Sequence, residues 1–183
     1  TEKLDGIRRI LVKEKGRCRL YSRSGIEDEG LVEIIEEARY LPDNTVYDGE
    51  LLAIGTYENS IALRQATNSI ANRKGIRKGV SFNIFDIIPL DEFKKGKSKY
   101  NALNRKLLLG AMFGDDGIQH LHDDWAKMMV AFDLGHQFKT IKAVPILGVV
   151  NTEEEIAELV TPIWKRGGEG IMLNTFEGYY ELK

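Results

Sequence analysis

Residues 3–22 read KLDGIRRILVKEKGRCRLYS, and this stretch contains a complete β-hairpin signal. The segments 8–12 and 18–22 are short and rich in apolar residues, and Lys15-Gly16 lies between them as a turn signal. The sequence therefore predicts two antiparallel strands here. A lysine, an Asp-Gly pair and two arginines precede or open the first strand, so charge is concentrated where the hairpin begins.

Further elements follow from the spacing of apolar residues along the rest of the chain. Helices are expected at 31–42, 99–113 and, after the capping-box pair Thr152 and Glu155, up to a stop at Gly167. Buried strands are expected at 46–55, 80–90, 144–150 and 169–174. The strands arrive in clusters without regular helix–strand alternation, which is typical of an α+β fold with mainly antiparallel sheets.

The two earlier helices have a predicted inward face. In the helix at 31–42 this face consists of Leu31, Ile34, Ile35 and Ala38. In the helix at 99–113 we expect Leu103, Leu107 and Leu108 to point inward.

Composition narrows the class of protein. The chain has 183 residues, 43% of them hydrophobic and 30% charged, a net charge of −2 and a pI near 6.0, which fits one globular domain and not a strongly basic nucleic-acid binder. No apolar run approaches the ~18–20 residues of a membrane span. Cys18 is the only cysteine, which excludes a disulfide framework and a cysteine zinc site and favours a reducing cytosol.

Lys3 is the first candidate for chemistry. A lysine amine is protonated at neutral pH, with a pKa near ~10.4, and becomes a nucleophile only when nearby cations or burial lower that pKa. Arg8 and Arg9 could contribute such a field, and Gly6 allows the backbone to approach a ligand closely. Taken alone, Lys-x-Asp-Gly is more typical of an ordinary surface turn than of a catalytic site.

Four later segments place polar or aromatic residues at strand ends or inside buried strands. Arg23 lies in Ser-Arg-Ser-Gly, Glu50 in Asp-Gly-Glu-Leu, Phe85 in Phe-Asn-Ile-Phe-Asp, and Glu169 in Glu-Gly-Ile-Met. A carboxylate that enters an apolar strand requires a partner such as a cation or a hydroxyl. Each segment also has a purely structural alternative, namely a turn or a core phenylalanine.

In this order, the five motifs resemble those of the covalent nucleotidyltransferases, and within them the ATP-dependent DNA ligases, especially those of bacteriophages. The resemblance runs from the first residue to about Asn174. It implies an α+β, ATP-grasp-like domain with antiparallel β-sheets flanked by helices and a nucleotide pocket between them. It also implies participation in DNA repair, replication and recombination.

The resemblance implies a role for each motif residue. Lys3 is similar to the nucleophile that attacks the α-phosphorus of ATP, expels pyrophosphate and carries AMP. The resemblance implies that Arg8 and Arg23 contact the nucleotide or a phosphate and that Glu50 binds the ribose. It implies that Phe85 and Met172 contact the two faces of adenine. Glu169 is similar to the carboxylate that positions Mg²⁺ or Mn²⁺. The AMP would then pass to the 5′-phosphate of nicked double-stranded DNA, and the 3′-hydroxyl would seal the strand. We expect the protein to be a monomer in the cytoplasm. If a phage encodes it, this is the cytoplasm of the bacterial host cell.

The sequence departs from the family pattern at several points. Asn174 replaces a lysine that contacts the α-phosphate, and an amide carries no charge. Lys183 comes too early for the family's last lysine pair. We therefore expect residues 1–183 to be an adenylation domain cut before that pair and before a C-terminal oligonucleotide-binding domain. Thr1 and Glu2 resemble the start of some RNA ligases.

A basic stretch lies between the strands at 46–55 and 80–90. Its members are candidates for salt-dependent contacts to DNA phosphates, with a solvated loop as the alternative: Arg64, Arg73, Lys74, Arg77 and Lys78. His120 and His122 suggest a metal site only weakly, because no further ligand cluster accompanies them.

Two other functions stay open at this point. One is an RNA ligase or an mRNA-capping type of nucleotidyltransferase, which keeps the chemistry and changes the substrate. The other is a non-catalytic nucleotide- or DNA-binding module, for which Asn174 is the sequence support.

Overall fold

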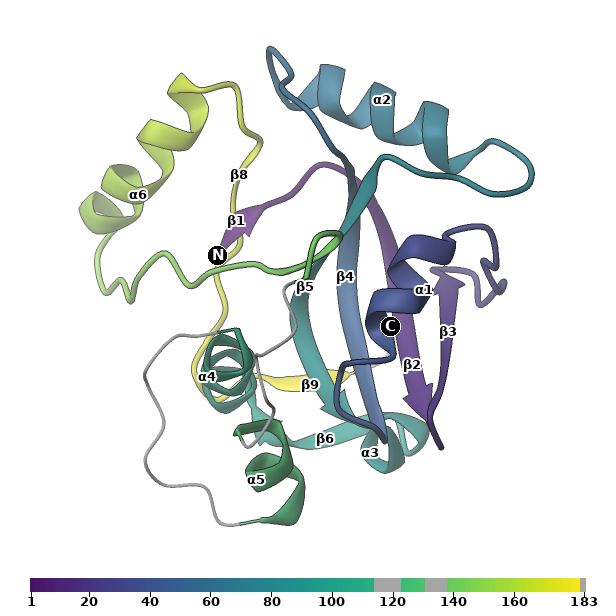
Figure 1. Ribbon diagram of the computed structural model, residues 1–183. Helices are drawn as coiled ribbons and strands as arrows, with labels where there is room; N and C mark the ends of the chain where they lie inside the picture. The colour runs from purple at the N-terminus through teal and green to yellow at the C-terminus, as the bar shows by residue number, and fades with distance from the viewer. Residues whose placement is uncertain (114–122, 131–137, 182–183) are drawn as a thin grey trace.

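The computed structural model describes residues 1–113, 123–130 and 138–181. Its centre is a five-stranded sheet in the order β3-β2-β4-β5-β7 (Figure 1). Neighbouring strands are antiparallel except for β5 and β7, which are parallel. The strands are β2 (Ile7–Glu14), β3 (Arg17–Ser22), β4 (Thr45–Ala53), β5 (Val80–Pro89) and β7 (Ile141–Ala143). The predicted α+β class is confirmed.

Two small antiparallel sheets complete the strand content of the described residues. One pairs β1 (Glu2–Lys3) with β8 (Gly170–Ile171), and the other pairs β6 (Lys97–Asn101) with β9 (Tyr179–Glu181). Both pairs join the beginning or middle of the chain to its last described segment. They therefore bring β8 beside the start of the chain and β9 beside its middle part (Figure 1).

The predicted hairpin is confirmed as β2 and β3. Glu14 lies opposite Arg17, which leaves a two-residue turn at Lys15 and Gly16. Both turn residues have positive φ, 50° and 74°, as a type I′ turn requires. The turn sequence therefore fixes the register of the hairpin.

Six helices are described: α1 (Val32–Ala38), α2 (Ser60–Ala71), α3 (Leu90–Lys94), α4 (Ala102–Met112), α5 (Asp124–Val130) and α6 (Glu153–Lys165). In α1 and its first flanking residue, Leu31, Ile34 and Ala38 are buried as predicted, whereas Ile35 is only partly buried. Together with Leu11, these three buried residues belong to the core on one face of the sheet. None of these described helices is long and apolar enough to cross a membrane.

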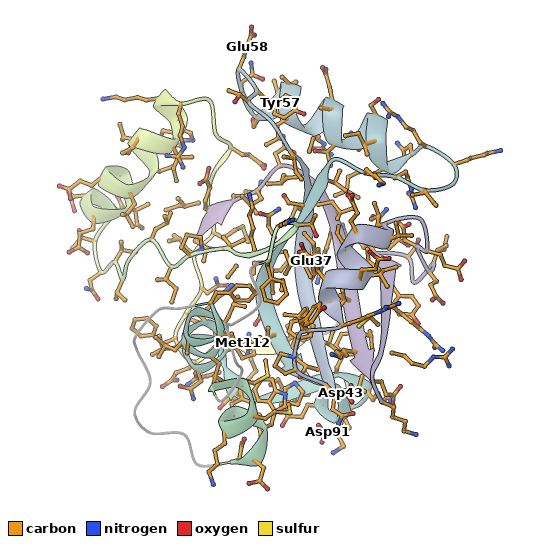
Figure 2. All side chains as sticks on the ribbon, in the orientation of Figure 1. Glu37, Asp43, Tyr57, Glu58, Asp91 and Met112 are labelled. Carbon is orange, nitrogen blue, oxygen red and sulfur yellow. The ribbon has the colours of Figure 1, made fainter. Side chains whose placement is uncertain are left out.

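Glu37 connects α1 to the edge of the sheet (Figure 2). Its carboxylate accepts hydrogen bonds from the backbone N–H groups of Lys139, Thr140 and Ile141 at 2.8–3.0 Å. Ile141 is the first residue of β7, and the other two donors directly precede it. The Glu37 carboxylate therefore fixes where the fifth strand of the sheet begins.

The inward face of α4 differs from the prediction. Leu108, Leu109 and Met112 are buried, whereas Leu103 and Leu107 are only partly buried. The cause is Arg105, whose side chain turns toward the sheet to pair with Asp86 and thereby sets the rotation of the helix. Apolar spacing alone could not reveal a buried arginine on that face.

Three other predictions need correction. The basic stretch contains helix α2, capped by Asn59, whose side-chain oxygen accepts from the N–H of Ala62. The predicted strand at 144–150 does not form, because only β7 and Val144 bond to β5 before the chain leaves the sheet. The predicted strand at 169–174 shrinks to Gly170–Ile171.

Candidate functional site

A row of polar side chains crosses one face of the central sheet. Arg8 lies directly opposite Glu50, Glu50 opposite Asn83, and Asn83 opposite Lys142. Residues opposite one another in a sheet project from the same face, so these four strands present a continuous polar strip. The next positions, Leu51 among them, belong to the buried core on the other face.

The surroundings of Glu50 are compatible with both the neutral and the charged form of its carboxyl group. Burial raises its pKa to about 7, although the backbone N–H of Gly6 donates to it and Arg8 is nearby. Gly6 must be glycine, because a Cβ there would lie 2.0 Å from the carbonyl oxygen of Leu51. The Asp-Gly pair near the start of the chain therefore lets the backbone reach Glu50.

Asp48 orients the arginine of this row. Its fully buried carboxylate accepts from Nε of Arg8 at 2.9 Å and from a terminal nitrogen at 2.5 Å. The hydroxyl of Tyr180 also donates to it, at 2.9 Å. The bond to Asp48 raises the pKa of Arg8, so this guanidinium stays charged. Asp48-Gly49 lies inside β4 and forms no hairpin turn.

Phe85 sits at a break in the ladder between β4 and β5. Asp48 pairs with Asp86 and Gly49 pairs with Ile84, which leaves Phe85 without an opposite residue. Such a bulge redirects one side chain relative to its neighbours. The partly buried ring of Phe85 is therefore aimed differently from the flanking core residues.

The turn after α6 places Glu169 close in space to the first residues of the chain. The N–H of Gly168 donates to the carbonyl of Ile163, and that of Gly167 donates to Trp164, which is a Schellman ending with Gly167 at φ 78°. The predicted capping box at Thr152 and the predicted stop at Gly167 are both confirmed.

The short β1–β8 pair then brings Lys3 beside Glu169. Lys3 lies opposite Gly170, the residue after Glu169, and the Lys3 ammonium donates to the Glu169 carboxylate. The two residues are separated by 166 positions in the sequence. A parallel ion pair between Arg166 and Glu2, at 2.6 Å, supports the same junction.

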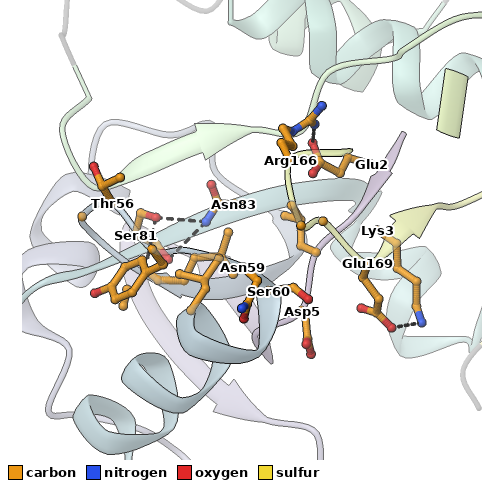
Figure 3. Close-up of a pocket in the computed structure, with 18 of the residues that line it drawn as sticks. Glu2, Lys3, Asp5, Thr56, Asn59, Ser60, Ser81, Asn83, Arg166 and Glu169 are labelled. Atoms are coloured by element: carbon orange, nitrogen blue, oxygen red, sulfur yellow. Dashed lines mark hydrogen bonds and ion pairs between the residues drawn. The ribbon is translucent and has the colours of Figure 1, made fainter. Parts of the chain in front are cut away.

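A cavity of about 440 Å³ lies at this junction (Figure 3). Lys3 and Glu169 form one end of it, and Asn83 and Ser81 line another part, with their side chains bonded to each other at 3.0 Å. Lys142 also lines it. The cavity therefore joins the β1–β8 pair to the polar strip of the sheet.

The structure brings some predicted site residues together and separates others. Lys3 and Glu169 share the first cavity, and Glu50 neighbours Asn83 in its wall without lining the cavity itself. Met172, 47% exposed, lines a different cavity of about 710 Å³. Phe85 lines none of the described cavities, and Arg23 is exposed in the turn after β3.

The residues present fit a divalent cation only in part. Among the described ranges, no three His, Cys, Asp or Glu side chains gather into a metal site. Magnesium usually keeps waters and binds through one or two carboxylates plus substrate phosphates, so Glu169 alone is compatible with it. His120, His122 and Lys183 lie outside the described residues.

The basic stretch divides into exposed and enclosed members. Arg73, Lys74 and Lys78 are exposed, and Arg64 pairs with Asp5 at 2.9 Å. Arg77 is enclosed, and both of its terminal nitrogens already have partners within the domain. Its side chain is only 11% exposed, and its guanidinium donates to the Asp28 carboxylate and to the carbonyl of Ala71.

Sequence reasoning missed several polar residues of this face. Lys142 and Arg105 carry no motif, and Asn83 and Asp86 lie inside Phe-Asn-Ile-Phe-Asp, where only Phe85 was assigned a role. Their signal is a polar residue inside an apolar strand, as in Ile141-Lys142-Ala143, and strand pairing is needed to show which side it faces.

Comparisons with known proteins identify the family of this chain. A sequence model of the family described as "ATP dependent DNA ligase domain" matches residues 1–183. The chain is 29% identical to "Probable DNA ligase" of Opitutus terrae over an alignment of 191 positions, which covers 93% of this chain. The chain spans 18% of that relative's length.

Solved structures share the fold at low sequence identity. Pmar-Lig_PreS3 is 22% identical with a TM-score of 0.74, over all of this chain and 39% of its own. The Chlorella virus DNA ligase-adenylate is 22% identical with a TM-score of 0.60, over all of this chain and 55% of its own. The bacteriophage T7 ATP-dependent DNA ligase, in complex with ATP, is 18% identical with a TM-score of 0.59, over 98% of this chain and 57% of its own. With the family match over its whole length, the chain belongs to the ATP-dependent DNA ligase domain family.

Proposed function

We propose that this domain forms a covalent adenylate on Lys3 from ATP. The observation that carries the proposal is the meeting of Lys3 and Glu169, from opposite ends of the chain, at the wall of one cavity. The Lys3 amine, once deprotonated, forms a nitrogen–phosphorus bond to the α-phosphorus. The bond from that phosphorus to the bridging oxygen breaks, and pyrophosphate leaves.

Glu169 is the residue that would hold Mg²⁺ or Mn²⁺, together with phosphate oxygens and water. The cation would neutralise charge on the departing phosphates. In the described state Glu169 pairs with Lys3 instead, and this pairing keeps the amine at the cavity wall. Asn174 is exposed and supplies no charge in place of the family's lysine, whereas Lys142 supplies one within the same cavity as Lys3.

The polar strip suits the sugar of the nucleotide. Glu50 would accept hydrogen bonds from ribose hydroxyls, and Arg8 would lie beside it with its guanidinium fixed by Asp48. Phe85 and Met172 would contact the two faces of adenine, and Arg23 a phosphate. These assignments rest on the motif resemblance and on the placement of Glu50 and Arg8 in one row.

For the protein as a whole we propose nick sealing. AMP would pass from Lys3 to a 5′-phosphate in nicked double-stranded DNA, and the 3′-hydroxyl would displace it. We further propose that residues 1–183 work as an adenylation domain with an oligonucleotide-binding domain, as a monomer in the cytoplasm of a bacterium or phage-infected host. The exposed Arg73, Lys74 and Lys78 would contact DNA phosphates.

The test is the intact mass of the protein after incubation with ATP and Mg²⁺. We expect a gain equal to one AMP, stable to denaturation, and no gain with GTP. Pre-adenylated protein from expression should lose that mass when pyrophosphate is added. Tight ATP binding without any adduct would contradict the proposal, and a GMP adduct would favour the capping type of enzyme.

Glu50 gives a pH prediction. With a pKa of about 7, its charged fraction rises roughly tenfold between pH 6 and pH 8. Ribose hydroxyls donate to the charged form, so binding should tighten by a similar factor over this range. Adenosine is the probe, because it has both hydroxyls and no phosphate that titrates here. Glu50→Gln should bind adenosine with no such dependence, and an equal slope in both proteins would contradict the prediction.

A further inference from the structure

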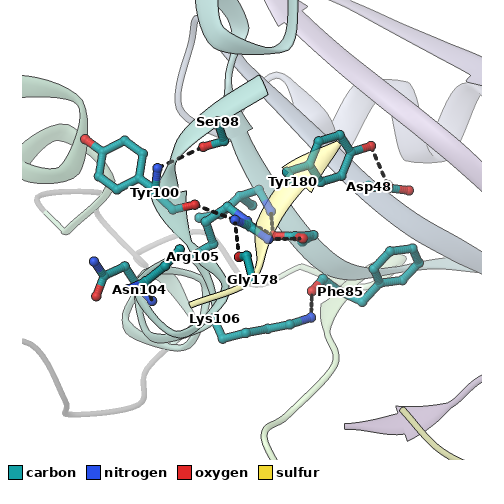
Figure 4. A network of polar contacts seen from close by, with 12 residues as sticks. Asp48, Phe85, Ser98, Tyr100, Asn104, Arg105, Lys106, Gly178 and Tyr180 are labelled. Atoms are coloured by element: carbon teal, nitrogen blue, oxygen red, sulfur yellow. Dashed lines mark hydrogen bonds and ion pairs between the residues drawn. The ribbon is translucent and has the colours of Figure 1, made fainter. Parts of the chain in front are cut away.

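Lys106 is a partly buried lysine that touches Phe85 (Figure 4). It projects from α4, and its ammonium donates to the backbone carbonyl of Phe85. The same nitrogen lies 5.7 Å from the centre of the Phe85 ring. No sequence motif marks this residue, and it reaches Phe85 at the bulge between β4 and β5.

Lys106 has donors without acceptors. An ammonium carries three N–H groups, and in the part of the chain that the structure describes only the Phe85 carbonyl accepts from it. No described carboxylate forms an ion pair with it. Burial lowers its pKa and the Arg105 guanidinium lowers it further, although Asp86 opposes this. A partly desolvated cation with free donors is stabilised by any ligand that offers lone pairs.

Lys106 borders space that a ligand can occupy. Lys106 lines the cavity of about 710 Å³ that Met172 also lines, together with a second cavity of about 520 Å³. It therefore contacts Phe85 and lines the same cavity as Met172. These are the two side chains assigned to opposite faces of the adenine ring.

We propose that Lys106 is a base-binding residue whose ammonium donates a hydrogen bond to a ring nitrogen on the edge of the bound purine. The inference rests on the proposed function, because it takes the base to lie on Phe85. A base stacked there presents its edge to groups beside the ring. The ring nitrogens N1, N3 and N7 of adenine are acceptors, whereas its exocyclic amine is a donor and cannot pair with an ammonium.

The test measures equilibrium binding of ATP and of its 1-deaza, 3-deaza and 7-deaza analogues to the 183-residue chain and to Lys106→Met. Lys106→Met should weaken ATP binding by about tenfold. One of the three analogues should bind the unaltered chain about tenfold more weakly than ATP does. The same analogue should bind the unaltered chain and Lys106→Met with equal affinity. Lys97→Met, an exposed lysine on β6, is the matched control and should bind all four nucleotides as the unaltered chain does.

Several outcomes would overturn the inference. One is an equal loss for every nucleotide on Lys106→Met, which would mean that Lys106 only positions Phe85. A second outcome does not depend on the folding of any variant. If the unaltered chain binds all three analogues as tightly as ATP, the protein forms no hydrogen bond to a ring nitrogen of the base. A chain that binds no ATP would overturn both proposals, whereas ATP binding with no AMP adduct would remove the adenylation proposal alone.

Discussion

Replacing Lys3 with arginine is expected to abolish the covalent AMP adduct while the domain stays folded. Arginine keeps a positive charge that can pair with Glu169, so the β1–β8 junction retains its ion pair. A guanidinium does not lose its proton in proteins, however, and has no nucleophilic amine. The rate of adduct formation should fall by a factor on the order of 10⁴ or more, as when other covalent nucleophiles are removed.

The measurement is the intact mass after incubation with ATP and Mg²⁺, with a melting curve to verify folding. Lys165→Arg, on the exposed surface of α6, is the matched control and should form the adduct at the original rate. An AMP adduct on the Lys3→Arg protein would show that another residue is the nucleophile. In that case the pairing of Lys3 with Glu169 would be purely structural.

The local parts of the fold follow from the sequence because their signals are local. The Lys15-Gly16 turn, the Thr152 cap and the glycine stop at Gly167 each satisfy backbone groups within a few residues. The predicted strand at 144–150 fails for the opposite reason. A strand needs a partner, and its apolar residues Ile146 and Val149 stay exposed instead.

The candidate site could be predicted as a set of residues but not as an arrangement. The motifs pointed to Lys3 and Glu169, and only the β1–β8 register shows that they meet. The polar strip depends on three strand pairings, so the sequence around Lys142 cannot show that this residue joins it. Phe85 lies at a bulge, and a one-residue change of register is invisible in apolar periodicity.

Arg105→Met is expected to cost about 3–5 kcal/mol in the free energy of unfolding. The Arg105 and Asp86 side chains are only 5% and 12% exposed, and they share two hydrogen bonds of 2.8 and 3.1 Å. Methionine fills a similar volume but leaves the Asp86 carboxylate buried without its cation. The substitution also removes a donor to the backbone carbonyl of Tyr100. Urea denaturation followed by circular dichroism measures the change.

Two further variants identify the cause of this loss. Lys95→Met removes an exposed partner of Asp91, at 3.6 Å with both side chains more than 70% exposed, and should cost less than about 0.5 kcal/mol. Adding Asp86→Asn to Arg105→Met should restore part of the loss, because an amide is less costly to bury than an unpaired carboxylate. If Arg105→Met costs no more than Lys95→Met, the Arg105–Asp86 pair does not hold α4 against β5. The rotation of α4, and with it the placement of Lys106 beside Phe85, would then depend on the apolar contacts of Leu108 and Met112 instead.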